Sequence, residues 1–217
     1  MKFSVLIFIL IVFIRSLSAV ELLKNGDFET GDITGWRYWE TYPWDGDGAP
    51  VELPVHLTIA LPGNIGIPMP PSTSGFFALT QQVSSGGTAR GGLYQEVRVI
   101  VNTPYVLTGY VSFYGDDIGD VAIIGILDSS WNPALTNTAL NRYYIGGNAI
   151  SPWVEFSLTI IPSKEVITVF TETRQDWMHG RVAGWYDNLS LKPVPEPTKL
   201  FLSHNPKGNI LYKEKYE

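Results

Sequence analysis

The sequence predicts an all-β protein, and three observations lead to this expectation. Short β-rich runs, interrupted by Gly, Pro, Asn and Asp, recur along the whole chain. No segment repeats apolar residues at a sustained helical period. Without residues 1–19 about 200 residues remain, which suits one β-sandwich or barrel with a sizeable core. We expect strands near 26–30, 36–41, 54–61, 75–83, 92–101, 104–115, 120–128, 153–161, 165–174 and 181–191.

Residues 1–19 have the layout of a secretory signal peptide, with Lys2, an apolar run from Phe3 to Ile14, Arg15 and then small residues. The 12-residue run is shorter than the roughly 20 residues that a membrane-spanning helix needs. We therefore expect cleavage near Ala19 and a secreted protein, extracellular or at the cell surface. We expect no stable membrane span in the mature chain, and an uncleaved anchor is the alternative.

Charge is spread unevenly. Residues 20–191 carry 8 Lys and Arg against 18 Asp and Glu, whereas residues 192–217 carry 5 Lys against 3 Glu. An acidic body repels phosphate, so we expect no nucleic-acid partner, while neutral sugars and divalent cations stay compatible. The chain has no cysteine, so its stability must come from core burial, hydrogen-bonded sheets or a metal.

Two connections stand out along the chain. Asn102-Thr103-Pro104 joins the runs 92–101 and 104–115, a pattern that predicts a β-hairpin. Prolines and glycines crowd the region 43–75, so it cannot be a regular central strand throughout. We expect a long ordered loop around one edge strand at 54–61. This loop either carries ligand contacts or merely covers a sheet edge.

Four motifs follow one another in the chain: NGDFETGDITGW at 25–36, LYQEVRVIVNTPYVLTGYVSFY at 93–114, WVEFSLT at 153–159 and WYDNLSL at 185–191. In this order they resemble the galactose-binding-like jelly rolls, which include the carbohydrate-binding modules of families four, nine and twenty-two. The resemblance implies a two-layer antiparallel β-sandwich over 20–192. It also implies that the first and last segments of this domain lie side by side.

The residues after Leu191 form a proline-rich linker, and we expect 193–217 to be a linker with a disordered tail. Within it, VPEPTKLFL at 194–202 resembles the start of a PEP-CTERM sorting signal. The apolar helix that should follow is missing, because Ser203, His204 and Asn205 come next. We therefore expect a degenerate signal, and the alternatives are a frameshifted remnant or a chance Pro-Glu-Pro in an ordinary linker.

The resemblance further implies a structural Ca²⁺, because Glu29 and Asp187 occupy the matching motif positions. Two carboxylates from neighbouring segments, completed by backbone carbonyls, form the oxygen-only site that this ion prefers. The alternative is that both carboxylates are solvated or cap backbone N–H groups in turns.

Aromatic residues gather at 36–44, where five occur in nine positions. Flat rings stack on the C–H faces of sugar rings, and nearby polar groups bind the hydroxyls. We expect Trp36 in the core. The candidates for ligand contacts are Trp39, Tyr42 and Trp44 as an exposed platform, Arg37 and Glu40 as polar partners, and then Trp177 and Gln95. The alternative for each ring is packing, the interpretation we give to Trp131, Trp153 and Trp185.

Catalysis finds little support in the sequence. It has no cysteine nucleophile, no H-E-x-x-H, no G-x-S-x-G and no phosphate-binding glycine loop. We therefore expect a monomeric, non-catalytic carbohydrate-binding module that recognises a polysaccharide or surface glycan. The alternative is a structural protein of the cell surface or extracellular matrix without sugar binding. A glycoside-active enzyme, which needs only two well-placed carboxylates, comes third.

Overall fold

The computed structural model describes residues 20–41, 57–59, 78–84, 89–139, 141–148, 150–175, 180–195, 203–204 and 210–211. The chain divides into two compact units, one of Val20–Val194 and one of Met1–Ala19 with Pro195–Glu217. In the second unit, strands β11 (Ser203–His204) and β12 (Ile210–Leu211) pair antiparallel. The expected signal peptide and most of the expected sorting signal lie outside the described residues and stay predictions.

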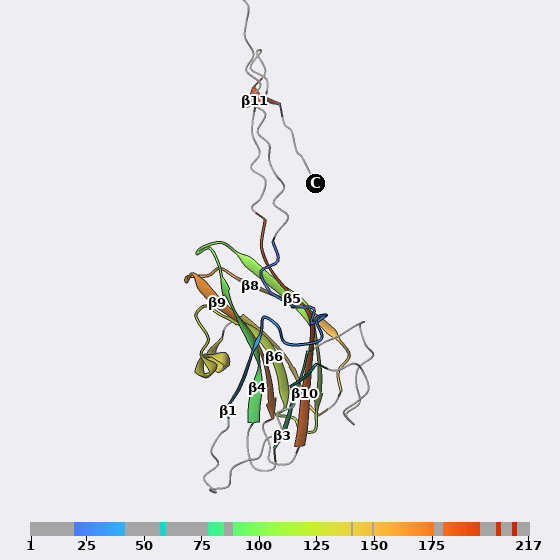
Figure 1. Ribbon diagram of the computed structural model, residues 1–217. Helices are drawn as coiled ribbons and strands as arrows, with labels where there is room; N and C mark the ends of the chain where they lie inside the picture. Colours follow the sequence, from blue (N-terminus) through green and yellow to red (C-terminus); the bar gives the residue numbers. More distant parts are fainter. Residues whose placement is uncertain are drawn as a thin grey trace, which may run out of the picture. The chain divides into compact units, whose positions relative to one another are not determined.

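The first unit consists of two five-stranded antiparallel sheets (Figure 1). Sheet A has the order β1-β4-β9-β6-β7, and sheet B has the order β2-β3-β10-β5-β8. The predicted all-β class and two-layer antiparallel jelly-roll sandwich are therefore confirmed. The strands are β1 (Arg37–Thr41), β2 (Leu57–Ile59), β3 (Ala78–Ser84), β4 (Ala89–Arg98), β5 (Tyr105–Gly115), β6 (Val121–Leu127), β7 (Asn141–Gly146), β8 (Val154–Ile160), β9 (Val166–Gln175) and β10 (Gly180–Pro193).

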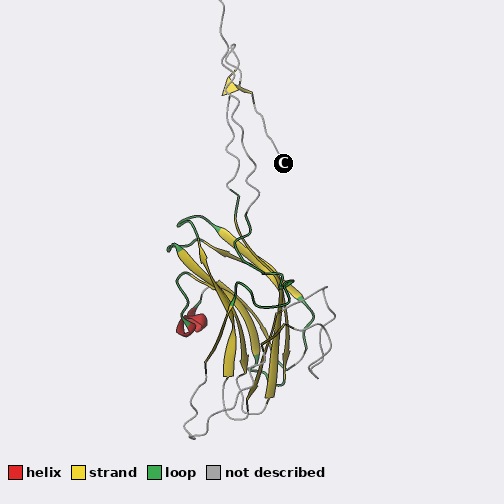
Figure 2. Cartoon of the chain, in the orientation of Figure 1, coloured by secondary structure: helices red, strands yellow, loops and turns green. Residues whose placement is uncertain are grey.

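The described residues contain one short 3₁₀-helix, η1 (Pro133–Thr138), which lies on the outside of the sandwich (Figure 2). Asn132 caps it, because its side-chain oxygen accepts a hydrogen bond from the Ala134 N–H at 3.0 Å. Within the described ranges no helix is long and apolar enough to cross a membrane.

The main core lies between the sheets and is made of apolar side chains from both. Because strand residues alternate between faces, every second residue of β4, β6 and β9 points toward sheet B. The fully buried members include Leu93, Ile124 and Val169 from sheet A and Leu107 and Tyr186 from sheet B. The expected core position of Trp36 is confirmed, because it is buried in this cluster.

The N-terminal segment closes the sandwich without forming a strand, so the expected strand at 26–30 is wrong. Asn25 and Phe28 have positive φ, which a strand does not allow. Asp32 fixes the turn, because its Oδ1 accepts hydrogen bonds of 2.8 Å from the Thr34 N–H and the Thr30 hydroxyl. The preference of this stretch for turns therefore prevails over its strand-like apolar residues.

The first and last segments of the domain lie side by side, as the resemblance implied. The Leu22 N–H donates to the Leu191 carbonyl at 3.0 Å, and the Leu189 N–H donates to the Gly26 carbonyl at 2.8 Å. Gly26 is required there, because a Cβ on it would lie 1.9 Å from the Leu189 oxygen.

The expected hairpin at 92–115 is wrong, because β4 belongs to sheet A and β5 to sheet B. The turn at Asn102, with φ of 62°, carries the chain across the edge of the sandwich. Two hydrogen bonds hold this crossover. The Ile100 N–H donates to the Tyr105 hydroxyl at 2.9 Å, and the Asn102 N–H donates to the Pro162 carbonyl at 2.9 Å.

Candidate functional site

The outer face of sheet A, which is the face turned away from sheet B, carries a cluster of four aromatic residues. They are Trp39 from β1, Tyr94 from β4, Phe170 from β9 and Trp131 from the segment 128–139. Trp131 stacks on Tyr94 with ring centroids 4.4 Å apart, and lies 5.0 Å from Trp39 and 6.1 Å from Phe170. Trp39 and Phe170 are buried, whereas Tyr94 and Trp131 are half-buried. We call this group the outer-face aromatic cluster.

Trp39 does not meet the expectation of an exposed platform, because only 6% of it is exposed. It is paired with Gly92 of β4, and its indole N–H donates to the Thr171 carbonyl of β9 at 3.1 Å. Gly92 leaves room for this contact, since a Cβ there would lie 2.1 Å from the Thr171 oxygen. Trp39 therefore forms part of the base of the cluster.

The segment 128–139 lies along this face and brings Trp131 to it. Hydrogen bonds of residues 128–131 hold the start of the segment to the sandwich. The Trp131 N–H donates to Glu96 Oε1 at 2.8 Å, the Thr168 hydroxyl donates to the Ser129 carbonyl at 2.7 Å, and the Ser163 hydroxyl donates to Asp128 at 2.7 Å. The expected packing role of Trp131 fits these contacts, but the ring packs outside the main core.

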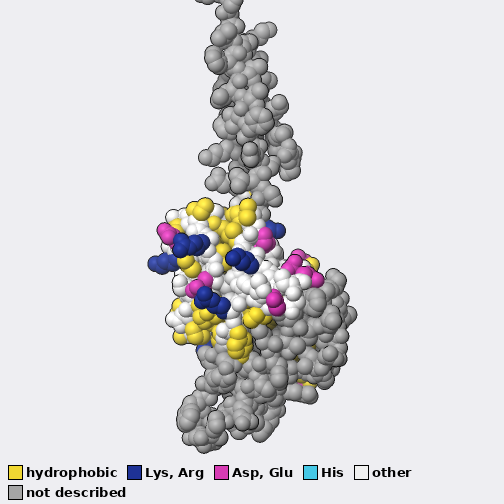
Figure 3. All heavy atoms as spheres, in the orientation of Figure 1, with side chains coloured by type: hydrophobic (Ala, Val, Ile, Leu, Met, Phe, Trp, Pro, Cys, Tyr) yellow, Lys and Arg dark blue, Asp and Glu magenta, His cyan; other side chains and the backbone are white. Residues whose placement is uncertain are grey.

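Arginines from three strands surround η1 beside the aromatic cluster. Arg90 of β4 and Arg142 of β7 each donate to Thr136 at 3.3 Å, to its hydroxyl and its carbonyl respectively. Arg174 of β9 donates to the Asn137 side chain. On the visible face of the molecule, basic and apolar side chains lie intermixed over the described part (Figure 3).

Glu172 is the buried counter-charge of these arginines. Arg174 binds its Oε1 through Nε at 2.9 Å and Nη2 at 2.5 Å, and Arg90 Nη1 lies 3.9 Å from the same atom. The Glu172 side chain is fully buried, and its second oxygen, Oε2, has no hydrogen-bond partner among the described residues. A buried carboxylate oxygen without a donor is costly, so this atom marks a place where a further donor would stabilise the face.

Among the expected polar partners whose side chains the structure describes, Arg37 is the one at the cluster. It is exposed, lies opposite Tyr94 and shares the outer face with it. A hydrogen bond to the Tyr94 side chain, together with electrostatic attraction to Tyr94 and Glu96, raises the pKa of Arg37. Its charge is therefore constant over the pH range in which proteins are handled.

Gln95 does not meet the expectation of a ligand contact, because both ends of its amide bind the backbone of Lys24. Its Oε1 accepts from the Lys24 N–H at 2.8 Å, and its Nε2 donates to the Lys24 carbonyl at 3.0 Å. Gln95 points to the inner side of sheet A and fastens the N-terminal segment there. Tyr42, Trp44, Trp177 and the side chain of Glu40 lie outside the described residues.

The expected calcium ligands come from the two segments that meet at the Leu189–Gly26 hydrogen bond. Glu29 is exposed, and Asp187 is 1% exposed with one carboxylate oxygen accepting from the Asn188 N–H at 2.7 Å. The register of β10 on β5 shifts between Asp187 and Ser190, so a bulge lies at this point. No group of three or more His, Asp or Glu gathers in the described part of the chain, so carbonyl oxygens would have to complete the site.

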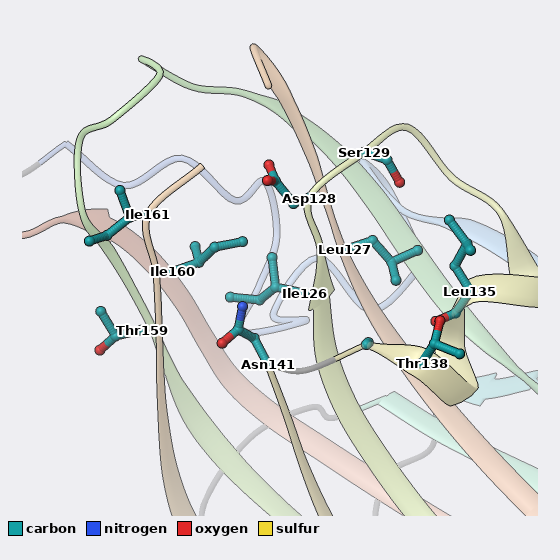
Figure 4. A pocket seen from close by; sticks show the side chains of 11 residues that line it. Ile126, Leu127, Asp128, Ser129, Leu135, Thr138, Asn141, Thr159, Ile160 and Ile161 are labelled. Atoms are coloured by element: carbon teal, nitrogen blue, oxygen red, sulfur yellow. The ribbon is translucent and has the colours of Figure 1, made fainter. Parts of the chain in front are cut away.

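A hollow of about 630 Å³ opens at the rim of the sandwich, where β6, β7, β8 and η1 meet. Its floor is aliphatic, with Ile126 and Ile160 buried and Leu135 and Ile161 exposed at the edge (Figure 4). None of the lining residues is aromatic. The Asp128 carboxylate at its rim is used by Ser163, so the hollow offers fewer sugar-binding groups than the outer face of sheet A.

No protein-family profile and no curated protein sequence matches the chain. Solved structures do resemble it. The carbohydrate-binding module TmCBM61, solved with β-1,4-galactotriose, has 16% identity over 81% of this chain and 100% of that one, with a TM-score of 0.48. A carbohydrate-binding module of family four has 15% identity over 79% and 99%, with a TM-score of 0.43. The arabinose-bound α-L-arabinofuranosidase MgGH51 has 16% identity over 80% of this chain and 26% of that one, with a TM-score of 0.45.

The likeness to carbohydrate-binding modules expected from the sequence is thus found among solved structures, beside a likeness to part of an enzyme. At these identities and TM-scores, none of the likenesses says what this chain binds.

Proposed function

We propose that this protein is a secreted, non-catalytic carbohydrate-binding module whose binding face is the outer face of sheet A. The observation that supports it is the outer-face aromatic cluster, with half-buried rings beside planar charged groups. Tyr94 and Trp131 offer ring surface, while Arg37 and Arg174 offer N–H donors next to it. Rings for the apolar face of a sugar and planar donors for its oxygens are what such recognition needs. Secretion rests on the sequence of residues 1–19 alone.

Binding is a better proposal than catalysis because the carboxylates of this face are already engaged. Glu96 accepts a hydrogen bond from the Trp131 backbone, and Glu172 is bound by Arg174. Glycoside hydrolysis needs one carboxylic acid free to protonate the leaving group and a second free to act as base or nucleophile. Glu96 and Glu172, the two carboxylates that face outward on the described strands of sheet A, instead hold Trp131 and Arg174 in place.

Affinity electrophoresis through gels that contain a panel of neutral and acidic polysaccharides tests the proposal. We expect at least one polysaccharide to retard the protein, and Trp131→Ala to weaken that binding about tenfold or more, because a stacking ring is lost. Trp153→Ala, which lies before β8 in sheet B, is the matched control and should bind normally. Should Trp131→Ala fold poorly, Arg37→Ala removes an exposed partner of the same face. No retardation by any polysaccharide, with unchanged Trp fluorescence, would favour the structural surface protein.

A structural Ca²⁺ at Glu29 and Asp187 is the second part of the proposal. The bound ion would supply positive charge to the buried Asp187 carboxylate and would hold the N-terminal segment to β10. Removing an ion bound only by the folded state lowers stability, so a chelator should lower Tm by about 5–10 °C. Asp187→Asn should abolish this shift, whereas Glu155→Gln, an exposed acid on β8, should keep it. A Tm that the chelator does not change would remove the ion and leave the sugar-binding proposal intact.

A further inference from the structure

The arginines of this chain gather on one sheet face. The sequence contains Arg15, Arg37, Arg90, Arg98, Arg142, Arg174 and Arg181. The strand register places five of these seven, all but the first and the last, on the outer face of sheet A. The outward positions of the same strands carry two acids, Glu96 and Glu172. A chain with a net charge of −6 therefore has a net positive sheet face.

The choice of arginine is itself informative. None of the outward positions of sheet A in the described strands is a lysine. Arginine presents a planar fork of N–H donors that matches a carboxylate or sulfate bidentately, whereas lysine offers a strongly hydrated point charge. If this face needed positive charge only for solubility, lysine would serve as well as arginine.

Arg98, Arg142 and Arg174 keep donors for a ligand. Arg174 uses Nε and Nη2 within the chain, and Arg142 uses Nη1. Arg98 is exposed at the end of β4 and makes no hydrogen bond or ion pair with the described part of the chain. Arg90 and Arg174 are 19% and 22% exposed, so both reach the surface beside Glu172.

The arginines also lie along a line. On β4, Arg90 and Arg98 are separated by eight residues, about 26 Å at the rise of a β-strand. Tyr94, with Trp131 stacked on it and Arg37 opposite, lies midway. A single sugar cannot reach both ends of this line, but a polymer lying along β4 can contact arginine at each end and stack on the rings between them.

From these observations we propose that the ligand of this face is an anionic polysaccharide, whose acid groups are bound by Arg98 at one end of β4 and by Arg174, the register partner of Arg90, at the other. The inference rests on the proposed function of the outer face and narrows it to one class of glycan. The shared chemistry is a planar or tetrahedral oxyanion on a sugar, which is a carboxylate in a polyuronate and a sulfate in a sulfated glycan.

The experiment compares matched polymers by affinity electrophoresis and calorimetry at two salt concentrations. The probes are polygalacturonate, its carboxyl-reduced neutral counterpart, dextran sulfate, unsulfated dextran and single-stranded DNA. We expect one of the two acidic polymers to bind, its neutral counterpart to bind about tenfold more weakly or not at all, and added salt to weaken the binding. Which acidic polymer binds distinguishes carboxylate from sulfate. Galacturonic acid alone should bind far more weakly than the polymer.

Variants locate the site. Arg98→Gln removes no hydrogen bond or ion pair within the described residues, so the variant should fold normally. It should lower the affinity for the acidic polymer about fivefold. Arg37→Gln, opposite Tyr94 at the middle of the line, should do the same. Lys192→Gln, an exposed side chain on β10 of sheet B, is the charge control and should bind normally. An equal loss in Lys192→Gln would overturn the proposal, because it would mean that only overall charge matters.

The outcomes separate the two proposals. Equal or tighter binding of the neutral polymers would overturn the anionic ligand and leave the carbohydrate-binding function standing. Binding of single-stranded DNA as tightly as the acidic polymers would also overturn it, because the face would then recognise charge alone. No binding of any polysaccharide would remove both proposals.

Discussion

The two faces of sheet A bury their side chains by different means. On the inner face, the strands β4, β6 and β9 contribute apolar residues to the main core. On the outer face, a small cluster of Ile123, Leu127 and Phe170 is joined by half-buried rings and bordered by ion pairs. Since strand residues alternate, the same strands make both faces. The difference teaches that the inner face holds the sandwich together, while the outer face keeps rings and charges near the surface.

Two neighbours on β6 give the sharpest test of this comparison. Ile124 points inward and is fully buried, and replacing it with Ala should lower the free energy of unfolding by about 3–5 kcal/mol, because a cavity opens in the main core. Urea denaturation measures this loss. Ligand affinity of the folded protein should not change. A loss below about 1 kcal/mol would mean that Ile124 lies in a loosely packed region.

Ile123 points outward and is 3% exposed. Replacing it with Ala removes the same atoms as Ile124→Ala, but from the outer face. We expect Ile123→Ala to cost about 2–3 kcal/mol, less than Ile124→Ala, because a small cluster at the surface can close around the gap. The same denaturation experiment measures it. Affinity should fall as well, since the rings above Ile123 lose support. A cost equal to that of Ile124→Ala would contradict the distinction between the faces.

Gln95 is a buried polar residue at the inner side of the sheet, and its loss should have a smaller effect. Gln95→Leu removes two hydrogen bonds to the backbone of Lys24, which should cost about 1–2 kcal/mol. Hydrogen exchange should rise in the N-terminal segment alone. Affinity for the ligand should stay the same, and a loss of affinity in a fully folded variant would restore Gln95 as a ligand contact.

The smallest expected effect concerns the turn that starts the sandwich. Hydrogen bonds from Thr34 and Thr30 lower the pKa of Asp32 below its usual value of 3.8. A lowered folded-state pKa gives stability that is complete above the unfolded-state pKa and is lost as the pH falls through the folded-state value. Asp32→Asn should therefore change Tm slightly at neutral pH and reduce its dependence on pH below about 4. Thermal melts between pH 2 and 7 would measure this, with Asp27→Asn as the control; an unchanged acid dependence would contradict it.

Local patterns predicted most strands of the sandwich, but not how they join. Alternating or apolar runs indicated the strands from β1 to β6 and from β8 to β10. The turn at Asn102 has the length of a hairpin, yet the chain passes from one sheet to the other there. Local sequence reports a turn, whereas the pairing of β4 with β9 depends on contacts made more than sixty residues apart. The strand β7 was missed although Tyr143 and Ile145 alternate with Arg142 and Tyr144, because turn residues flank this short run.

The candidate site was less predictable than the fold. Aromatic residues near 36–44 pointed to β1, an edge strand of sheet A, and Arg37 lies on the outer face of that sheet. The burial of Trp39 depends on Gly92 and Thr171, which no local pattern relates to it. Trp131 was expected to pack, and only the stacking on Tyr94 places it at the surface. The alternation of Arg90, Tyr94, Glu96 and Arg98 in β4 was the available signal for a charged face.

The N-terminal segment and β10 run antiparallel, joined by the Leu22–Leu191 and Leu189–Gly26 hydrogen bonds. A tension applied between Val20 and Val194 would therefore break these hydrogen bonds one after another from the end of the pair, instead of loading them all at once. The domain would yield at its two ends at modest force while the strands behind them stay paired. If the protein is tethered at one end and bound to a polymer along the outer face of sheet A, mechanical load would reach these hydrogen bonds only through the tethered end of the chain.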